Sequence, residues 1–257
     1  MKPAKFVFSF ALLSILLCSS PAVFAQRSYL YGVQPGDPHI IFRDNMVIVK
    51  NGMLTATWSI AKEKLRGVSF VDHAAAKPIR LPQDAFTLVF GDGKTLGASS
   101  MRISEPARPE YLDATEQSAR AEEHFAGNRV VVRLQDPNSK LSVLWSAELR
   151  EGDNYIRQQI EVSSPVDVPI QEVRLFDFNL PSAELVGTVN GSPVVAGNVF
   201  LGFEHPLSQC AVKGTHVRCS IDRKLPLKAG QTIRYSSVMG VSPVGQMRRG
   251  FLNYVER

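Results

Sequence analysis

The sequence feature that most constrains the fold is a repeated alternation of apolar and polar residues between turn residues. In the segment 46–60, MVIVKNGMLTATWSI, residues alternate on both sides of Asn51-Gly52. An Asn-Gly pair favours a two-residue type I′ turn, so the segment predicts an antiparallel hairpin. With this turn, Val49 faces Leu54, and one face of the hairpin is apolar on both strands.

The same pattern recurs along most of the chain. The segments 129–134, 141–149 and 155–163 alternate in the same way, with turn residues between them, and they predict a three-strand meander. Helical periodicity is nearly absent before the last residues. We therefore expect an all-β fold: one large antiparallel β-sandwich over residues 26–242. Trp58 and Trp145 fall on inward-facing positions of these strands and are predicted to pack in the core.

Two stretches are less regular, namely residues 74–82 and 104–127. The second contains Glu122-Glu123, and we expect these residues to lie in a short helix or an exposed polar loop. Asp177 alternates outward between two phenylalanines, so it is predicted to lie on the surface.

The segment 243–257 differs in character from the strands before it. Met247, Phe251 and Val255 stand at i, i+4 and i+8, which predicts a short helix over 246–257 with one apolar stripe. We expect this stripe to lack a partner on the sandwich and to be a site where another protein could bind.

The first residues have the features of a secretory leader. Lys2 and Lys5 precede the apolar run 6–18, and the small residues before Gln26 suit a signal peptidase. We expect residues 1–25 to be a signal peptide and the protein to be periplasmic or extracellular. The apolar run is too short to span a membrane.

The charge of the chain does not favour nucleic acid as a partner. The formal net charge is +5, and two of these charges belong to the predicted leader. The basic residues form no clustered stripe, so the sequence predicts no nucleic-acid partner.

Two cysteines remain after the predicted leader, Cys210 and Cys219. A two-residue turn at Gly214-Thr215 would place them directly opposite each other in a hairpin, where a disulfide can form. Disulfides persist in exported proteins, which favours this pairing. The alternatives are two free thiols, or a metal site for which other ligands are missing. In the same register, His216 lies on the opposite face and is predicted to be solvated.

The stretch 197–206, GNVFLGFEHP, supplies the candidate site residues, Glu204 and His205. Neighbouring residues on a strand point to opposite faces, so one cannot act directly on the other. Either the pair faces a ligand, or Glu204 is buried against an arginine. The sequence contains no zinc-binding spacing, phosphate-binding loop or dinucleotide-binding motif, so we predict no metal and no cofactor.

Three stretches carry a family resemblance: GNVFLGFEHPLSQ (197–209), RLFDFNLP (174–181) and MRRGFLNYVER (247–257). Together they resemble the N-terminal β-supersandwich module, which is galactose mutarotase-like, of exported α-galactosidase-like glycoside hydrolases, some of which are labelled "enterotoxin". In that family the sandwich precedes a (β/α)₈ barrel that carries the catalytic carboxylates. The resemblance implies that residues 243–257 form a helical linker that would lead into such a barrel. It transfers no catalytic residue to this sequence.

Two functions are consistent with the resemblance. The first is a non-catalytic, carbohydrate-associated module, a truncated or split N-terminal domain of such a hydrolase. The second is an enzyme like aldose 1-epimerase (mutarotase), which needs a carboxylate base and an imidazole acid over one sugar ring. Its candidates are Glu204, His205, His39 and His73, and no motif places them together.

Overall fold

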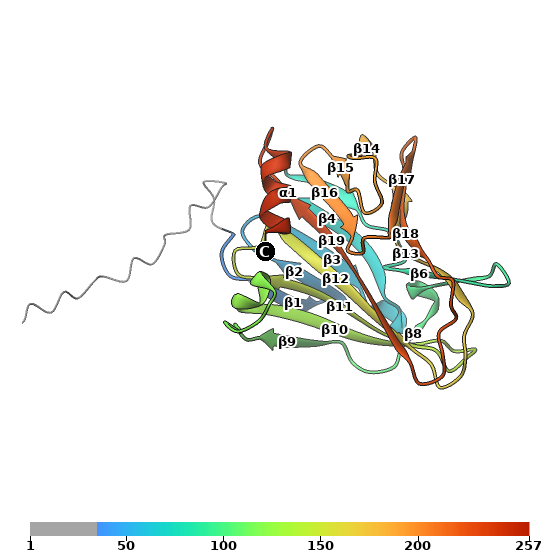
Figure 1. The fold of residues 1–257 in the computed structure, drawn as a ribbon. Helices are drawn as coiled ribbons and strands as arrows, with labels where there is room; N and C mark the ends of the chain where they lie inside the picture. Colours follow the sequence, from blue (N-terminus) through green and yellow to red (C-terminus); the bar gives the residue numbers. More distant parts are fainter. Residues whose placement is uncertain (1–34, 257) are drawn as a thin grey trace, which may run out of the picture.

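The computed structural model describes residues 35–256 as an all-β protein with one α-helix, so the predicted fold class is confirmed. The predicted signal peptide, residues 1–25, lies outside the described residues. Every strand pairing within the sheets is antiparallel, and the strands form three sheets (Figure 1).

The first sheet contains the N-terminal strands in simple sequential order. Its members are β1 (His39–Arg43), β2 (Met46–Lys50), β3 (Leu54–Ser59), β4 (Arg66–Asp72) and β5 (Lys77–Arg80). A 3₁₀ turn, η1 (Ala61–Glu63), joins β3 to β4.

The second sheet has nine strands and forms the largest layer of the molecule. Its order is β14-β15-β16-β19-β12-β11-β10-β8, and β9 also pairs with β10. Its strands are β8 (Arg102–Ile103), β9 (Arg108–Leu112), β10 (Gly127–Gln135), β11 (Ser142–Arg150), β12 (Tyr155–Ser163), β14 (Ala183–Leu185), β15 (Val194–Ala196), β16 (Val199–Phe203) and β19 (Thr232–Val241). The predicted meander forms its centre as β10, β11 and β12.

The third sheet has the order β17-β18-β13-β6-β7. Its strands are β6 (Thr87–Phe90), β7 (Thr95–Gly97), β13 (Ile170–Asn179), β17 (Gln209–Lys213) and β18 (His216–Asp222). Two further 3₁₀ turns, η2 (Ala98–Ser100) and η3 (Ala121–His124), lie in the connections between strands.

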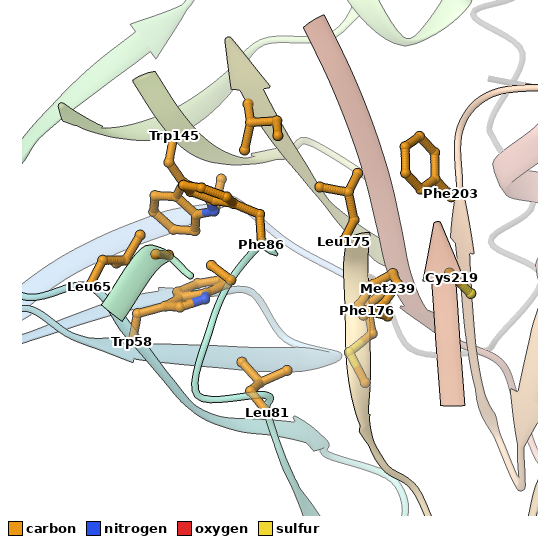
Figure 2. Close-up of a cluster of buried hydrophobic side chains, with 14 of the residues drawn as sticks. Trp58, Leu65, Leu81, Phe86, Trp145, Leu175, Phe176, Phe203, Cys219 and Met239 are labelled. Carbon is orange, nitrogen blue, oxygen red and sulfur yellow. The ribbon is translucent and has the colours of Figure 1, made fainter. Parts of the chain in front are cut away.

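Both five-stranded sheets pack on the same face of the nine-stranded sheet. Trp58 of the first sheet meets Trp145 of β11 with ring centroids 5.1 Å apart, and both side chains are buried as the sequence predicts. Phe176 of the third sheet and Met239 of β19 belong to the same continuous core (Figure 2). Cross-strand pairing places Trp145 and Met239 on one face of the sheet. The architecture is therefore a sandwich with a divided second layer.

The register of the β2–β3 hairpin differs from the predicted one. Val49 pairs with Ala56 rather than Leu54, so the turn is centred one residue later than Asn51-Gly52. The side-chain oxygen of Asn51 accepts the backbone N–H groups of Met53 and Leu54, which fixes a different turn. The two-residue change in pairing keeps the same residues on the inward face, because side chains alternate with a period of two.

The C-terminal helix α1 (Met247–Val255) forms where the sequence predicts it, but it does not lack a partner. It lies against the outer face of the nine-stranded sheet, beside β16 (Figure 1). Phe251 meets Phe200 of β16 at 5.5 Å between ring centroids, and Met247 packs on the same cluster. Of the predicted stripe, Val255 alone is mostly exposed, at 57%.

A nine-residue helix is marginal in water by itself, so tertiary packing stabilises α1. We expect Phe251→Ala to lower the free energy of unfolding by roughly 2–3 kcal/mol, somewhat less than the loss for a fully buried phenylalanine, since Phe251 is half-buried. Urea denaturation followed by tryptophan fluorescence would measure this loss. Leu252→Ala is the matched control on the same helix, because Leu252 is 42% exposed, and it should change stability by less than about 0.5 kcal/mol. Equal effects of the two substitutions would contradict the docking of α1 through Phe251.

Candidate functional site

The candidate site is an ionic cluster centred on Arg157, under helix α1. Arg157 lies on β12 and points to the outer face of the nine-stranded sheet, since Ile156 and Ile160 point into the core. The pairing of β11 with β12 places it beside Glu148. Although it faces outward, Arg157 is only 8% exposed.

Glu204, which follows β16, makes a bidentate salt bridge with Arg157. The Arg157 Nε donates to Oε2 of Glu204 at 2.7 Å, and Nη2 donates to Oε1 at 2.7 Å. The backbone N–H of Glu204 donates to the Ser236 carbonyl, which keeps the residue attached to the middle of β19. The structure therefore contains the glutamate–arginine pair that the sequence offered as one of two interpretations.

The electrostatics of this pair keep Glu204 ionised. Burial alone would raise the pKa of Glu204, because it removes water from the carboxylate. The hydrogen bonds and the positive charge of Arg157 outweigh burial and lower the pKa below its usual value, with further hydrogen bonds from Ser236 and Tyr254 acting in the same direction.

Glu122 supplies a second carboxylate to the same guanidinium. It lies on η3, is 2% exposed, and forms ion pairs with Arg157 and with Arg120. The hydroxyl of Tyr155 also donates to it at 3.4 Å. Sequence reasoning placed Glu122 in a polar loop or short helix without assigning it a role. No local pattern marks it as buried, because its partners are distant in the sequence.

Tyr254 of α1 connects the helix to the cluster. Its hydroxyl donates to Oε1 of Glu204 at 2.8 Å, and its ring meets that of Tyr155 at 5.0 Å between centroids. Burial raises the pKa of Tyr254 well above its usual value, and the nearby charge and hydrogen bond of Glu204 raise it further. The hydroxyl therefore stays protonated at physiological pH and remains a hydrogen-bond donor.

Beside the cluster lies an open pocket of about 420 Å³. It is lined by Ala119, Arg120, Ala121, Glu122, Arg157, Tyr254, Val255 and Glu256. Its buried charges are all engaged with one another. Glu204 does not suit proton donation at neutral pH, since its pKa is lowered and both its oxygens accept bonds from Arg157. The contacts of the Arg157 cluster therefore hold η3 and α1 against the nine-stranded sheet.

His205 points away from Glu204 and serves a different turn. Its Nδ1 accepts the backbone N–H of Leu207 at 3.1 Å, and its carbonyl accepts the backbone N–H of Ser208. Its ring lies 6.2 Å from that of Tyr235. Glu204 and His205 therefore do not form an acid/base couple, and contact of either with a ligand stays a prediction.

The other candidate histidines lie on the first sheet. His39 begins β1, and His73 follows β4, where its ring bonds the Thr55 hydroxyl and the Gly52 carbonyl, each at 2.9 Å. Within residues 35–256, no hydrogen bond or ring contact joins either histidine to Glu204. The epimerase-like alternative thus has no assembled acid/base pair in the described part of the chain.

The cysteine hairpin has the predicted register. Cys210 pairs with Cys219 across β17 and β18, and the structure contains the disulfide, with the two Cα atoms 4.0 Å apart. His216 is not simply solvated as the sequence suggested, because its Nε2 lies 2.8 Å from Oδ1 of Asp177. Asp177 itself lies at an outward position, as predicted, where it also pairs with Arg174.

Two further searches of the described residues gave negative findings. Between residues 35 and 256, no group of three or more histidine, cysteine, aspartate or glutamate side chains is placed to hold a metal ion. In the same range, no helix has the length and apolar character needed to cross a bilayer.

Comparison with known proteins gives a likeness in fold alone. No protein-family model matches the sequence, and no curated protein matches it either. Among solved structures, the chain is similar to the GH36 α-galactosidase AgaB from Geobacillus stearothermophilus, with a TM-score of 0.54 at 12% identity. It is also similar to the galactosidase domain of the α-galactosidase-sucrose kinase AgaSK, with a TM-score of 0.53 at 10% identity.

These likenesses cover much more of this chain than of the solved ones. They span 80% of this chain in both cases, but 41% of the AgaB chain and 42% of the AgaSK chain. The likeness falls on the N-terminal region of these α-galactosidases. The structure therefore confirms the resemblance as one of fold, between this chain and the sandwich part of longer proteins.

Because the folded-state pKa of Glu204 is lowered, its stabilising contribution should depend on pH in a defined direction. The contribution is fully present above the unfolded-state pKa, about 4.3, and is lost as pH falls through the lower folded-state pKa. We expect Glu204→Gln to cost about 1–3 kcal/mol at pH 7, since Arg157 loses an ionised partner. The cost should shrink as pH falls below about 4.

Urea denaturation between pH 3 and pH 7 would measure this difference. Glu184→Gln is the control, because Glu184 is an exposed glutamate on the edge strand β14 and should have little effect at any pH. A Glu204→Gln cost that is the same at pH 3 and pH 7 would show that the ionised form of Glu204 is not what stabilises the fold.

Proposed function

We propose that this chain is an exported, non-catalytic, carbohydrate-associated module, equivalent to the N-terminal domain of an α-galactosidase-like glycoside hydrolase. The observation that carries the proposal is the likeness to AgaB, which covers 80% of this chain at a TM-score above 0.5. A whole-domain likeness of this kind supports a shared architecture. Function belongs to the site rather than to the fold, so the sugar context is an inference by analogy.

The geometry of the Arg157 cluster supports a non-catalytic role. A general acid at neutral pH needs a raised pKa, and a general base needs a free oxygen aimed at its substrate. Glu204 has a lowered pKa and accepts three hydrogen bonds from Arg157 and Tyr254. Glu122 is almost completely buried between two arginines. Both carboxylates are therefore better suited to holding the domain together.

The cysteine hairpin supports export. A disulfide between Cys210 and Cys219 persists in an oxidising compartment and not in a reducing cytosol. This agrees with the leader-like composition of residues 1–25.

The proposal predicts binding without turnover. We expect the purified exported chain to hydrolyse no aryl α-galactoside, and to give saturable signals with α-galactosyl oligosaccharides on a glycan array. Raffinose and stachyose are suitable ligands, and maltotriose, an α-glucoside, is the matched control sugar. Turnover that survives repeated purification would contradict the non-catalytic role. Absence of binding to every sugar on the array would contradict the carbohydrate association.

Export makes a separate prediction. Expressed with its leader in a bacterial host, the protein should be recovered from the periplasm or medium with Gln26 as its first residue. Its intact mass should be lower than that of the reduced form by two hydrogen atoms, because Cys210 and Cys219 are bonded. Cys210→Ser, which cannot form this bond, is the control for the mass difference. Full-length protein in the cytosol with three free thiols, those of Cys18, Cys210 and Cys219, would contradict export.

A further inference from the structure

The sandwich has an open edge where the first sheet ends at β1. β1 lies over β10 and β2 lies over β11, and the side chain of Asn128 on β10 donates to the carbonyl of Pro38 at 2.7 Å. β9 pairs with the edge of β10 that faces away from β11, so it lies one strand further out (Figure 1). In the described part of the chain, no strand of the first sheet extends beyond β1. The inward face of β9 therefore forms a ledge, the β9 ledge, beside the free edge of β1.

The exposure of the β9 side chains agrees with this arrangement. Pro109 pairs with Val130, which is in the core, and Tyr111 pairs with Asn128, so Pro109 and Tyr111 belong to the inward face. Both are nevertheless exposed, Tyr111 at 66%, whereas Glu110 on the outward face is partly buried. In a strand covered by the second layer, the inward side chains would be the buried ones.

The free edge of β1 presents main-chain hydrogen-bonding groups to this ledge. Arg43 pairs with Met46 across the two-residue turn 44–45, in which both residues have positive φ, as in a type I′ turn. The pair that flanks such a turn is hydrogen-bonded, and bonded pairs alternate along an antiparallel ladder. Every second residue from Arg43 thus bonds to β2, and Ile40 and Phe42 direct their N–H and C=O groups to the free edge.

A second aromatic side chain lies at this edge. Phe42 pairs with Val47 of the core and so belongs to the inward face of the first sheet, yet it is 40% exposed. Among the large apolar side chains that are exposed between residues 35 and 256, the aromatic ones are Phe42 and Tyr111. Exposed apolar surface of this kind often marks a site of interaction.

The chain that leads into β1 approaches from the side away from the ledge. The carbonyl of Pro35 accepts the backbone N–H of Gly52, which lies in the turn between β2 and β3. Residues 35–38 therefore lie on the β2 side of β1, and the ledge is on the other side.

The chemistry of the ledge suits a neutral ligand that carries hydroxyl groups and an apolar face. The charged side chains of β9 are already paired, Arg108 with Glu110 at 3.1 Å and Glu110 with Arg129 at 2.6 Å. The free main-chain groups of β1 include both donors and acceptors, and a hydroxyl can pair with either. The ring face of an exposed tyrosine carries partial negative charge and attracts C–H groups. A pyranose ring has both features, since its C–H groups form an apolar face and its hydroxyls lie at the rim.

We propose that the β9 ledge is the carbohydrate-binding surface of this chain. The ring of Tyr111 stacks on the apolar face of one sugar unit, the main-chain groups of Ile40 bind its hydroxyls, and Phe42 contacts a second unit further along β1. This inference rests on the carbohydrate association proposed above and adds its location. It assigns no role in binding to the Arg157 cluster.

The test is a titration of the full exported chain with stachyose, followed by ¹H–¹⁵N NMR. We expect saturable shifts of the amide signals of Ile40, Phe42 and Tyr111. Tyr111→Ala should weaken binding by about tenfold, the loss expected for one aromatic stacking contact, without unfolding the chain, because the side chain is exposed. Tyr111→Phe keeps the ring and should bind like the wild type. Leu225→Ala is the matched control, because Leu225 is also exposed, at 74%, and lies outside the ledge.

The outcomes separate this inference from the proposed function. If the wild-type chain binds stachyose and Tyr111→Ala binds it equally well, the ledge is not the binding surface, although the carbohydrate association stands. Shifts confined to residues outside β1 and β9 would have the same meaning. If no sugar binds to the wild-type chain, the proposed function fails first. Saturable shifts of the β1 amides with a six-residue alternating Thr-Val peptide, and none with stachyose, would assign the edge to peptide binding and overturn the inference.

Discussion

One guanidinium, that of Arg157, holds three separate parts of the chain on the outer face of the nine-stranded sheet. It pairs with Glu122 from η3 and with Glu204 from the end of β16, and Tyr254 of α1 joins through Glu204. Replacing a buried ion pair as a whole can be nearly neutral, but removing one partner is costly, because a charge is left without compensation. The three parts must therefore dock together, and the cluster specifies where η3 and α1 lie.

The same bonds limit what the cluster can do chemically. An acid/base residue must gain and lose a proton near the working pH, and its oxygen must be accessible to the substrate. Arg157 prevents Glu204 from meeting either requirement, since it lowers the pKa of the Glu204 carboxyl and hydrogen-bonds to both of its oxygens. Stabilisation of the fold and proton transfer are thus competing uses of this carboxylate, and the geometry favours the first. This is the physical reason to assign Glu204 a structural role.

Local patterns were sufficient for the parts of the fold that local forces determine. Alternation located the strands, and the Gly214-Thr215 turn gave the correct pairing of Cys210 with Cys219. The predicted β2–β3 register was wrong because Asn51 also donates to the carbonyl of Asp153, in the turn between β11 and β12. The burial of Glu122 depends on a partner 35 positions away. Such long-range contacts leave no periodic signal in one sequence, which is why the site was only partly predicted.

The docking of α1 has the same origin. Its apolar stripe resembles an unpartnered interface until Phe200 and Tyr155 are known to lie beneath it. Asn154 adds hydrogen bonds between the sheet and the helix: its side chain donates to the Val241 carbonyl at 2.6 Å and accepts from Asn253 of the helix at 3.1 Å. Asn154 directly precedes β12, the strand that carries Arg157, so the connection from β19 to α1 and the Arg157 cluster are held by the same part of the sheet.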